Sequence, residues 1–127
     1  SAAAVLELAG LVLDGRLAAA RGDHAAAIEK LEAAVAAQDR LVYDEPPAWF
    51  FPVRETLGAV LLRAGRTEAA ERVFRADLER NPRSGRSLFG LRETLRAQGR
   101  GSEAEWVSGQ FEAAWRNADV KLRLEDL

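Results

Sequence analysis

The sequence contains no cysteine and no methionine, and histidine occurs once, at His24. Without cysteine the chain can form neither a disulfide nor a thiolate metal site, and it has no thiol nucleophile. A Ser-His-Asp arrangement or a histidine-ligated metal would have to use His24, which follows Gly22-Asp23 at a turn. We therefore predict no catalytic residue, no metal site and no cofactor, and so a protein that is not an enzyme.

Long apolar runs are also absent. No stretch approaches the roughly 20 apolar residues that a membrane-spanning helix needs. Residues 2–13 are apolar but are interrupted by Glu7 and lack a basic flank, so they make a poor signal peptide. We expect a soluble protein of the cytoplasm or the periplasm, with no membrane partner. Because the chain does not begin with methionine, we also expect it to be part of a longer protein.

What the sequence does contain favours helices. Hydrophobic residues make up 48% of the 127 residues, and alanine and leucine, both good helix formers, dominate among them. A chain of this length forms one domain and buries roughly two thirds of its unfolded surface. These features predict a single all-α domain over residues 1–127.

Charge is unevenly distributed, although the net charge is only −2. Residues 63–100 hold ten Arg against five acidic residues, whereas residues 1–62 and 101–127 are net acidic. A charge run of this kind is usually a solvated helix face. The slightly negative net charge argues against nucleic acid as a partner. RNA or phosphate binding by the arginines is therefore the interpretation that we favour least.

Amphipathic segments separated by glycine or proline predict six helices. We expect them at about 2–20, 24–41, from 48 or 49 to the glycine at 65, from 67 to the proline at 82, 85–98, and from 102 onward. Ser84 and Ser102 are suited to cap the last two helices. The final helix is expected to extend to about residue 122 as the cap that a helical array needs. A separate short helix within residues 120–127 is the alternative.

A 34-residue period underlies these segments. The middle unit, about 51–84, carries Leu57, Gly58, Leu61, Gly65, Ala70, Phe74 and Pro82. The next unit, about 85–118, repeats the positions with Leu91, Leu95, Gly99 and Ala104. A Leu-Gly, Ala-x-x-x-Phe, Pro pattern at this period is typical of the tetratricopeptide repeat, or TPR, which the chain resembles. A first, less complete unit covers about 8–41.

The resemblance implies an α-α superhelix of three TPR-like helix hairpins, with a long first helix and an extended C-terminal capping helix. Arg54 and Asp77 depart from the family, which favours Trp and Ala at their positions. Because TPR proteins generally hold other proteins, the resemblance implies a protein–protein interaction module. The alternative is a structural part of a longer helical array, or a self-association module without a ligand of its own.

An insertion at about 42–50 lengthens the interval between Gly22 and Gly65 beyond the repeat. Insertions in helical repeats map to loops, and such loops often carry binding residues. We expect Tyr43, Trp49 and Phe50 either to contact a partner or to pack against the hairpin and seal it. The block from Tyr43 to Pro52 also resembles one in bacterial TPR proteins, so we expect the C-terminal TPR region of a longer bacterial protein.

The resemblance also implies which residues line the groove, because the first helix of each TPR pair faces it. The expected partner-binding residues are Arg16, Glu55, Arg63, Arg86, Phe89, Glu93 and Arg96. Four arginines against two glutamates make this groove net basic, and an aromatic side chain adds an apolar anchor. We therefore expect an extended, mildly acidic peptide or partner segment. The alternative is that the charges pair with one another, Arg63 with Glu93 for instance, and bind nothing.

Chaperone-binding TPR domains use Lys and Asn to hold a terminal carboxylate. The corresponding positions here hold Val12, Arg16, Thr56, Arg86 and Gly90, of which only the arginines could serve. A heat-shock chaperone is therefore not the expected partner.

Overall fold

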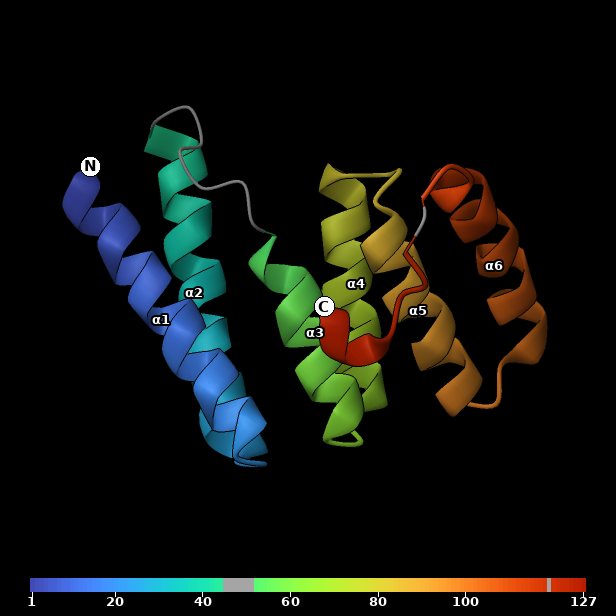
Figure 1. The fold of residues 1–127 in the computed structure, drawn as a ribbon, viewed down its shortest axis with the longest axis horizontal. Helices are drawn as coiled ribbons and strands as arrows, with labels where there is room; N and C mark the ends of the chain where they lie inside the picture. Colours follow the sequence, from blue (N-terminus) through green and yellow to red (C-terminus); the bar gives the residue numbers. More distant parts are fainter. Residues whose placement is uncertain (45–51, 119) are drawn as a thin grey trace.

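The computed structural model describes residues 1–44, 52–118 and 120–127, and its described part is helical (Figure 1). The elements are α1 (Ala2–Ala20), α2 (His24–Asp44), α3 (Val53–Arg63), α4 (Thr67–Arg80), α5 (Gly85–Ala97), α6 (Gly101–Trp115) and a short 3₁₀ helix, η1 (Leu124–Asp126). The described residues contain no strand, so the predicted all-α fold class is confirmed.

Consecutive helices pack in pairs, α1 on α2, α3 on α4 and α5 on α6. The pairs contact one another in chain order through α2 with α3 and α4 with α5, and α3 also touches α5. Figure 1 shows the resulting row of helices, with α1 at one end and α6 at the other. The final segment, residues 120–127, does not extend this row but returns over α5 and α3. We call it the C-terminal tail.

Each pair is joined by a turn with the same backbone geometry. Gly22, Gly65 and Gly99 have φ values of 77°, 79° and 73°, a left-handed conformation that glycine adopts without a Cβ penalty. The N–H of the next residue then donates to a helix carbonyl five positions earlier, at 2.9 Å in all three turns. This is the hydrogen bond of a Schellman motif, which satisfies an otherwise unpaired carbonyl at a helix end. The helix ends predicted at these glycines are confirmed.

Close helix contacts depend on two further glycines. The ring of Phe74 in α4 is 0% exposed and lies against Gly58 of α3 and Gly90 of α5. A Cβ atom at Gly58 would lie 2.6 Å from this ring, which is closer than carbon atoms pack. The Gly and Phe positions of the sequence pattern therefore mark where neighbouring helices approach most closely.

The predicted extension of the last helix to residue 122 is wrong, because α6 ends at Trp115. A turn follows, in which the indole Nε1 of Trp115 donates to the main-chain oxygen of Val120 at 2.8 Å. The tail then buries Leu122 and Leu127 to 8% and 2% exposure, and a straight continuation of α6 would lose this burial. The alternative expectation, a separate short helix in this region, is confirmed as η1.

Other helix boundaries differ in detail from the predictions. Ser84 caps α5 as expected, accepting a hydrogen bond from the N–H of Ser87 at 3.2 Å. Ser102 does not cap α6, which already begins at Gly101. The third helix begins at Val53, later than predicted, and Pro52 is its N-cap residue rather than part of its first turn. No helix in the described ranges is both long enough and apolar enough to cross a membrane.

Candidate functional site

The C-terminal tail is held by side chains from three different helices. Arg86 of α5 donates from Nη2 to the main-chain oxygen of Asp126. Thr56 of α3 donates from its hydroxyl to the main-chain oxygen of Leu127 at 2.6 Å. Arg16 of α1 donates from Nη2 to the same oxygen at 3.2 Å. We call this surface the α1–α3–α5 face, and it is where the sequence predicted a partner.

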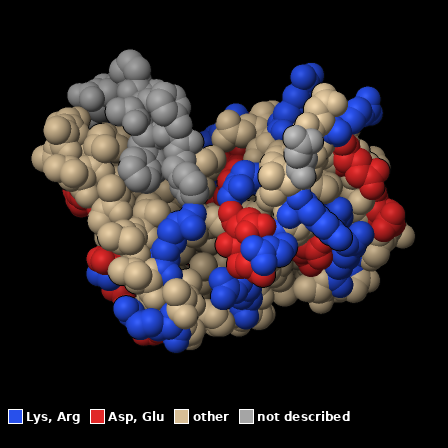
Figure 2. All heavy atoms as spheres, viewed as in Figure 1, with Lys and Arg blue, Asp and Glu red and all other residues tan. Residues whose placement is uncertain are grey.

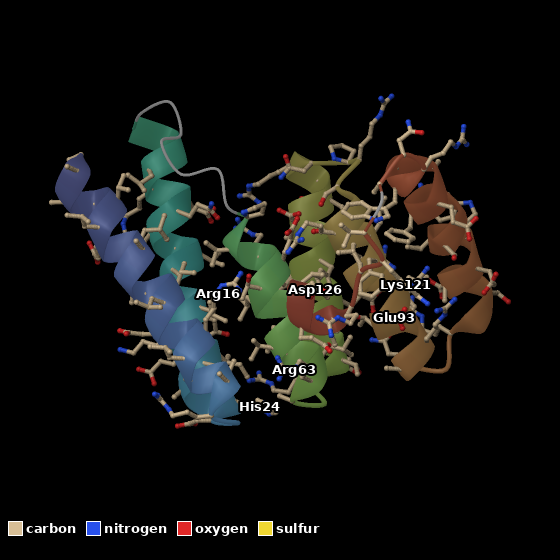
Figure 3. The ribbon with its side chains drawn as sticks, viewed as in Figure 1. Arg16, His24, Arg63, Glu93, Lys121 and Asp126 are labelled. Atoms are coloured by element: carbon tan, nitrogen blue, oxygen red, sulfur yellow. The ribbon has the colours of Figure 1, made fainter. Side chains whose placement is uncertain are left out.

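Thr56 forms hydrogen bonds with both Arg16 and the end of the tail. Its hydroxyl oxygen accepts a hydrogen bond from Arg16 Nη2 at 3.1 Å while its proton goes to Leu127. The pKa of Arg16 is lowered, first by burial and then by the charge of Arg86. The guanidinium groups of Arg16 and Arg86, which come from helices far apart in the sequence, therefore both reach the end of the tail. Figure 3 labels Arg16 on α1 and Asp126 in the tail.

Glu55 is buried and forms an ion pair with Arg86. Its side chain is only 2% exposed, and its carboxylate accepts from Arg86 Nε at 2.9 Å and from the Ser84 hydroxyl at 3.1 Å. Burial raises the pKa of Glu55, against the opposing effect of these two hydrogen bonds. A buried carboxylate with fixed donors has one orientation, so Glu55 fixes the guanidinium that reaches Asp126.

The tail carries its own local hydrogen bonds. The carboxylate of Asp126 accepts from the main-chain N–H of Arg123 at 2.9 Å and from the Arg123 guanidinium at 3.2 Å. Both hydrogen bonds lower the pKa of Asp126, and the bond from the main chain has the larger effect. They close the single turn of η1, which directs the last two main-chain oxygens of the tail toward the three helices.

The tail is also amphipathic. Leu122 and Leu127 belong to the buried apolar cluster, together with Val12 of α1 and Ala59 of α3. Lys121, Arg123 and Glu125 are exposed instead. The tail thus buries its leucines against the helices and presents its long charged side chains to solvent.

Three of the predicted groove residues meet at this site, namely Arg16, Glu55 and Arg86. Arg63 is exposed and lies nearer the turn between α3 and α4, away from the tail (Figure 3). Glu93 pairs with Arg92 at 3.0 Å and with Arg96 at 3.3 Å. Among the described residues the ion pairs of Glu93 are therefore with its own helix, and not with Arg63.

Phe89 packs between helices. Its side chain is 7% exposed, its ring centre lies 5.7 Å from that of Phe111 in α6, and the Arg92 guanidinium lies 5.1 Å above it. Phe111 in turn stacks on Trp115 at 6.0 Å. Phe89 therefore contributes to the α5–α6 contact and offers little free surface to a partner.

Sequence reasoning missed the tail and did not include Thr56 among the binding residues. The tail alternates leucine with charged residues from Lys121 to Glu125, and this pattern is a signal that could have suggested a docked segment. Of the residues expected in the insertion, Trp49 and Phe50 lie outside the described residues, as does the side chain of Tyr43.

More than half of the arginines in the arginine-rich stretch, residues 63–100, lie close to an acidic side chain. Six of its arginines have a carboxylate oxygen within 3.8 Å: Arg75, Arg80, Arg86, Arg92, Arg96 and Arg100. Figure 2 shows basic and acidic side chains intermingled over this half of the molecule. Paired arginines are poorer contacts for phosphate, so this arrangement does not favour RNA binding.

In the part of the chain that the structure describes, no three His, Cys, Asp or Glu side chains are grouped so that they could hold a metal ion. Comparison of the sequence with protein-family models finds no match, and neither a curated protein nor a solved structure matches the chain significantly.

Proposed function

We propose that this chain is a TPR-like protein–protein interaction module that binds a segment of a partner across the α1–α3–α5 face. The observation that carries the proposal is the docked tail. Arg16, Thr56 and Arg86 already hold two consecutive main-chain oxygens of a polypeptide. Main-chain oxygens are present in every peptide, so the same donors suit a segment from another protein.

The TPR-like arrangement is supported by the repetition of its turns. Gly65 and Gly99 are 34 residues apart and adopt the same left-handed conformation with the same hydrogen bond after it. Gly15 and Gly58 both lie where the partner helix of their pair approaches most closely, against Leu31 and Phe74. A superhelix of such pairs has a concave side lined by α1, α3 and α5.

The chemistry of the face favours binding over catalysis. It offers guanidinium and hydroxyl donors around a buried carboxylate, and this carboxylate is paired with Arg86 and Ser84. General acid–base catalysis needs a titratable group within reach of a substrate proton. We propose that the module acts without catalysis or a cofactor, and that its partner segment is mildly acidic because Arg16 and Arg86 converge there.

The test uses a variant in which the face is open. Leu122→Ser with Leu127→Ser removes the two buried anchors of the tail, and we call this double substitution the tail-released variant. Peptides selected from a random displayed library on this variant are then measured by calorimetry. We expect Arg86→Ala in the same background to weaken binding about tenfold or more, a loss of the size found at interface hot spots.

Arg63→Ala is the matched control, because this arginine is exposed and lies away from the tail. It should leave the affinity unchanged. Selected peptides that bind both variants equally would place the binding site elsewhere, and failure to select any peptide would count against a peptide-binding face.

A second candidate function is structural, and an exposed apolar stripe on α1 favours it. Leu6, Leu13 and Leu17 are 71%, 58% and 48% exposed, and their spacing places them on one side of the helix. In a longer array a preceding helix would cover this stripe. Light scattering tests self-association through it: if the purified chain is larger than a monomer, Leu13→Glu should restore the monomer, and a monomeric wild-type chain excludes this form of the function.

A further inference from the structure

We propose that the C-terminal tail is an intramolecular competitor for the α1–α3–α5 face, and that the segment which displaces it shares its chemistry. That segment has two aliphatic side chains spaced as Leu122 and Leu127 are, and an acidic residue directly before the second one. This inference rests on the proposed function and adds to it the class of ligand and the condition for binding.

The hydrogen bonds to the helices do not themselves select a sequence. Thr56 and Arg86 reach main-chain oxygens of the tail, and any peptide could supply these. Selectivity must therefore come from the side chains that the tail buries, which are Leu122 and Leu127. Each buried leucine contributes through the apolar area it removes from water.

The acidic residue is needed for the shape of the segment. In an extended strand, successive residues face opposite ways, so two consecutive oxygens could not both reach the same surface. The tail solves this with the turn of η1, in which Asp126 accepts from the N–H of Arg123 at 2.9 Å. A ligand that presents its oxygens to Arg86 and Thr56 together needs an equivalent acid.

Electrostatics also favour an acidic residue at this position of the ligand. The guanidinium of Arg86 contributes to holding the pKa of Asp126 below its ordinary range, and Arg16 lies beside Arg86 under the tail. A segment with an ionised acid at this position is therefore attracted to the face, whereas one with a lysine or arginine there would be repelled.

Competition follows from the covalent connection. The tail leaves α6 at Trp115, whose indole fixes Val120, so it stays close to the face at an effective concentration on the order of millimolar. An external segment with the same contacts binds only the molecules whose tail has left, and its apparent affinity is its intrinsic affinity multiplied by the fraction of such molecules. Releasing the tail should thus raise the affinity for such a segment.

The probe is a synthetic peptide with the sequence of residues 120–127, acetylated and amidated at its ends and labelled with fluorescein. Its binding to the full chain is measured by fluorescence anisotropy. We expect the tail-released variant to bind at least about tenfold more tightly than the wild type. Val120→Ser is the matched control, since Val120 is 62% exposed and its substitution should leave the wild-type affinity unchanged.

Changes in the peptide test the ligand class. Replacement of the peptide's aspartate by asparagine, or of its last leucine by serine, should each weaken binding to the tail-released variant. Equal affinity of wild type and tail-released variant would overturn the competition. Absence of binding by a tail-released variant whose circular dichroism remains helical would overturn the ligand class. If library peptides still bind through Arg86 in that case, the proposed function stands and this inference alone fails.

Displacement can be observed directly at the indole of Trp115, which donates to Val120 in the docked state. Its resonance in a ¹H–¹⁵N spectrum is assigned with Trp115→Phe. Adding saturating peptide to the wild-type chain should move this resonance toward its position in the tail-released variant. Peptide that binds without moving it does not displace the tail, and this result would also overturn the proposal.

Discussion

Glu55 and Arg86 form an ion pair of 2.9 Å, in which the side chain of Glu55 is only 2% exposed and that of Arg86 is 31% exposed. Removing a carboxylate from water is costly. This burial, with a smaller contribution from the charge of Asp77, raises the pKa of Glu55 against the effect of its hydrogen bonds. The main role of this pair is therefore to position Arg86 under the tail, and its contribution to the stability of the fold is smaller.

The first prediction concerns the pH dependence of this pair. Because the pKa of Glu55 is raised on folding, the folded chain binds its proton more tightly than the unfolded chain does. The free energy of unfolding therefore falls as pH rises from the ordinary glutamate value through the raised one, and the full cost is present above it. Glu55→Gln removes this titration, so the stability of the variant relative to wild type should increase as the pH rises above the ordinary pKa of a glutamate.

Urea denaturation at a series of pH values measures this difference. Glu103→Gln is a control at an exposed ion pair, where the hydrogen bond from Arg100 lowers the pKa of Glu103 instead of raising it, so this variant should not reproduce the same rise. A stability difference between Glu55→Gln and wild type that stays constant over the range would contradict the prediction.

The second prediction concerns the hydroxyl of Thr56. Thr56→Val keeps the side-chain shape but removes both the donor to Leu127 at 2.6 Å and the acceptor for Arg16 at 3.1 Å. Leu127 retains Arg16 as a donor, so we expect the docked tail to lose about 0.5–1.5 kcal/mol. Trypsin cleavage after Lys121 and Arg123 measures this loss, because it should be faster when the tail is released.

Thr94→Val is the matched control for this substitution. Thr94 is also buried, at 0% exposed, but its hydroxyl donates to Gly90 within α5 at 2.8 Å and does not contact the tail. It should leave the rate of trypsin cleavage in the tail unchanged. Equal acceleration by both substitutions would show that Thr56 acts through general stability and not through the tail.

The helix pairs could be predicted from the sequence because the residues that determine them are close together along the chain. A glycine at each turn ends one helix, and the next apolar stripe starts the following one, as at Gly65 and Gly99. The pairing of Gly58 with Phe74 could be anticipated as well, since a residue without a Cβ opposite a large ring predicts close helix contact.

The tail could not be predicted in the same way. The alternation of leucine with charged residues suggests a docked segment, but Leu122 also continues the apolar pattern of the last helix. The choice depends on contacts with Arg16, Thr56 and Arg86 far away in the sequence. Asp77 shows the same limit. The sequence marked it as a departure from the TPR pattern, but only the fold brings Ser87 beside it, where the hydroxyl donates to the buried Asp77 carboxylate.

The third prediction concerns the packing of Phe74. Phe74→Ala should lower the free energy of unfolding by about 3–5 kcal/mol, because the ring fills the space against Gly58 and Gly90 and leaves a cavity when removed. Trp106→Ala is the control for an aromatic of similar size that is 70% exposed, and it should change stability by less than about 0.5 kcal/mol. Thermal and urea unfolding measure the stability of both variants. Equal losses of unfolding free energy in the two would contradict the packing of Phe74 in the core.

The fourth prediction compares two glycines whose replacement should act in opposite directions. Gly65 has a φ of 79°, and an alanine there meets a Cβ clash with its own backbone that costs roughly 1–2 kcal/mol. Gly109 lies inside α6, where an added Cβ has no neighbour within 4 Å. Alanine at that position lowers the entropy of the unfolded chain and should stabilise the helix by roughly 0.5–1 kcal/mol.

Thermal unfolding of Gly65→Ala and Gly109→Ala against wild type checks this pair. Each kcal/mol corresponds to a shift of roughly 3–6 °C in Tm for a chain of this size, so Gly65→Ala should melt several degrees below wild type and Gly109→Ala a few degrees above it. The two substitutions add the same methyl group, so only the backbone conformation of the glycine can give the opposite signs. Shifts of the same sign would mean that the turn at Gly65 does not hold the left-handed conformation in solution.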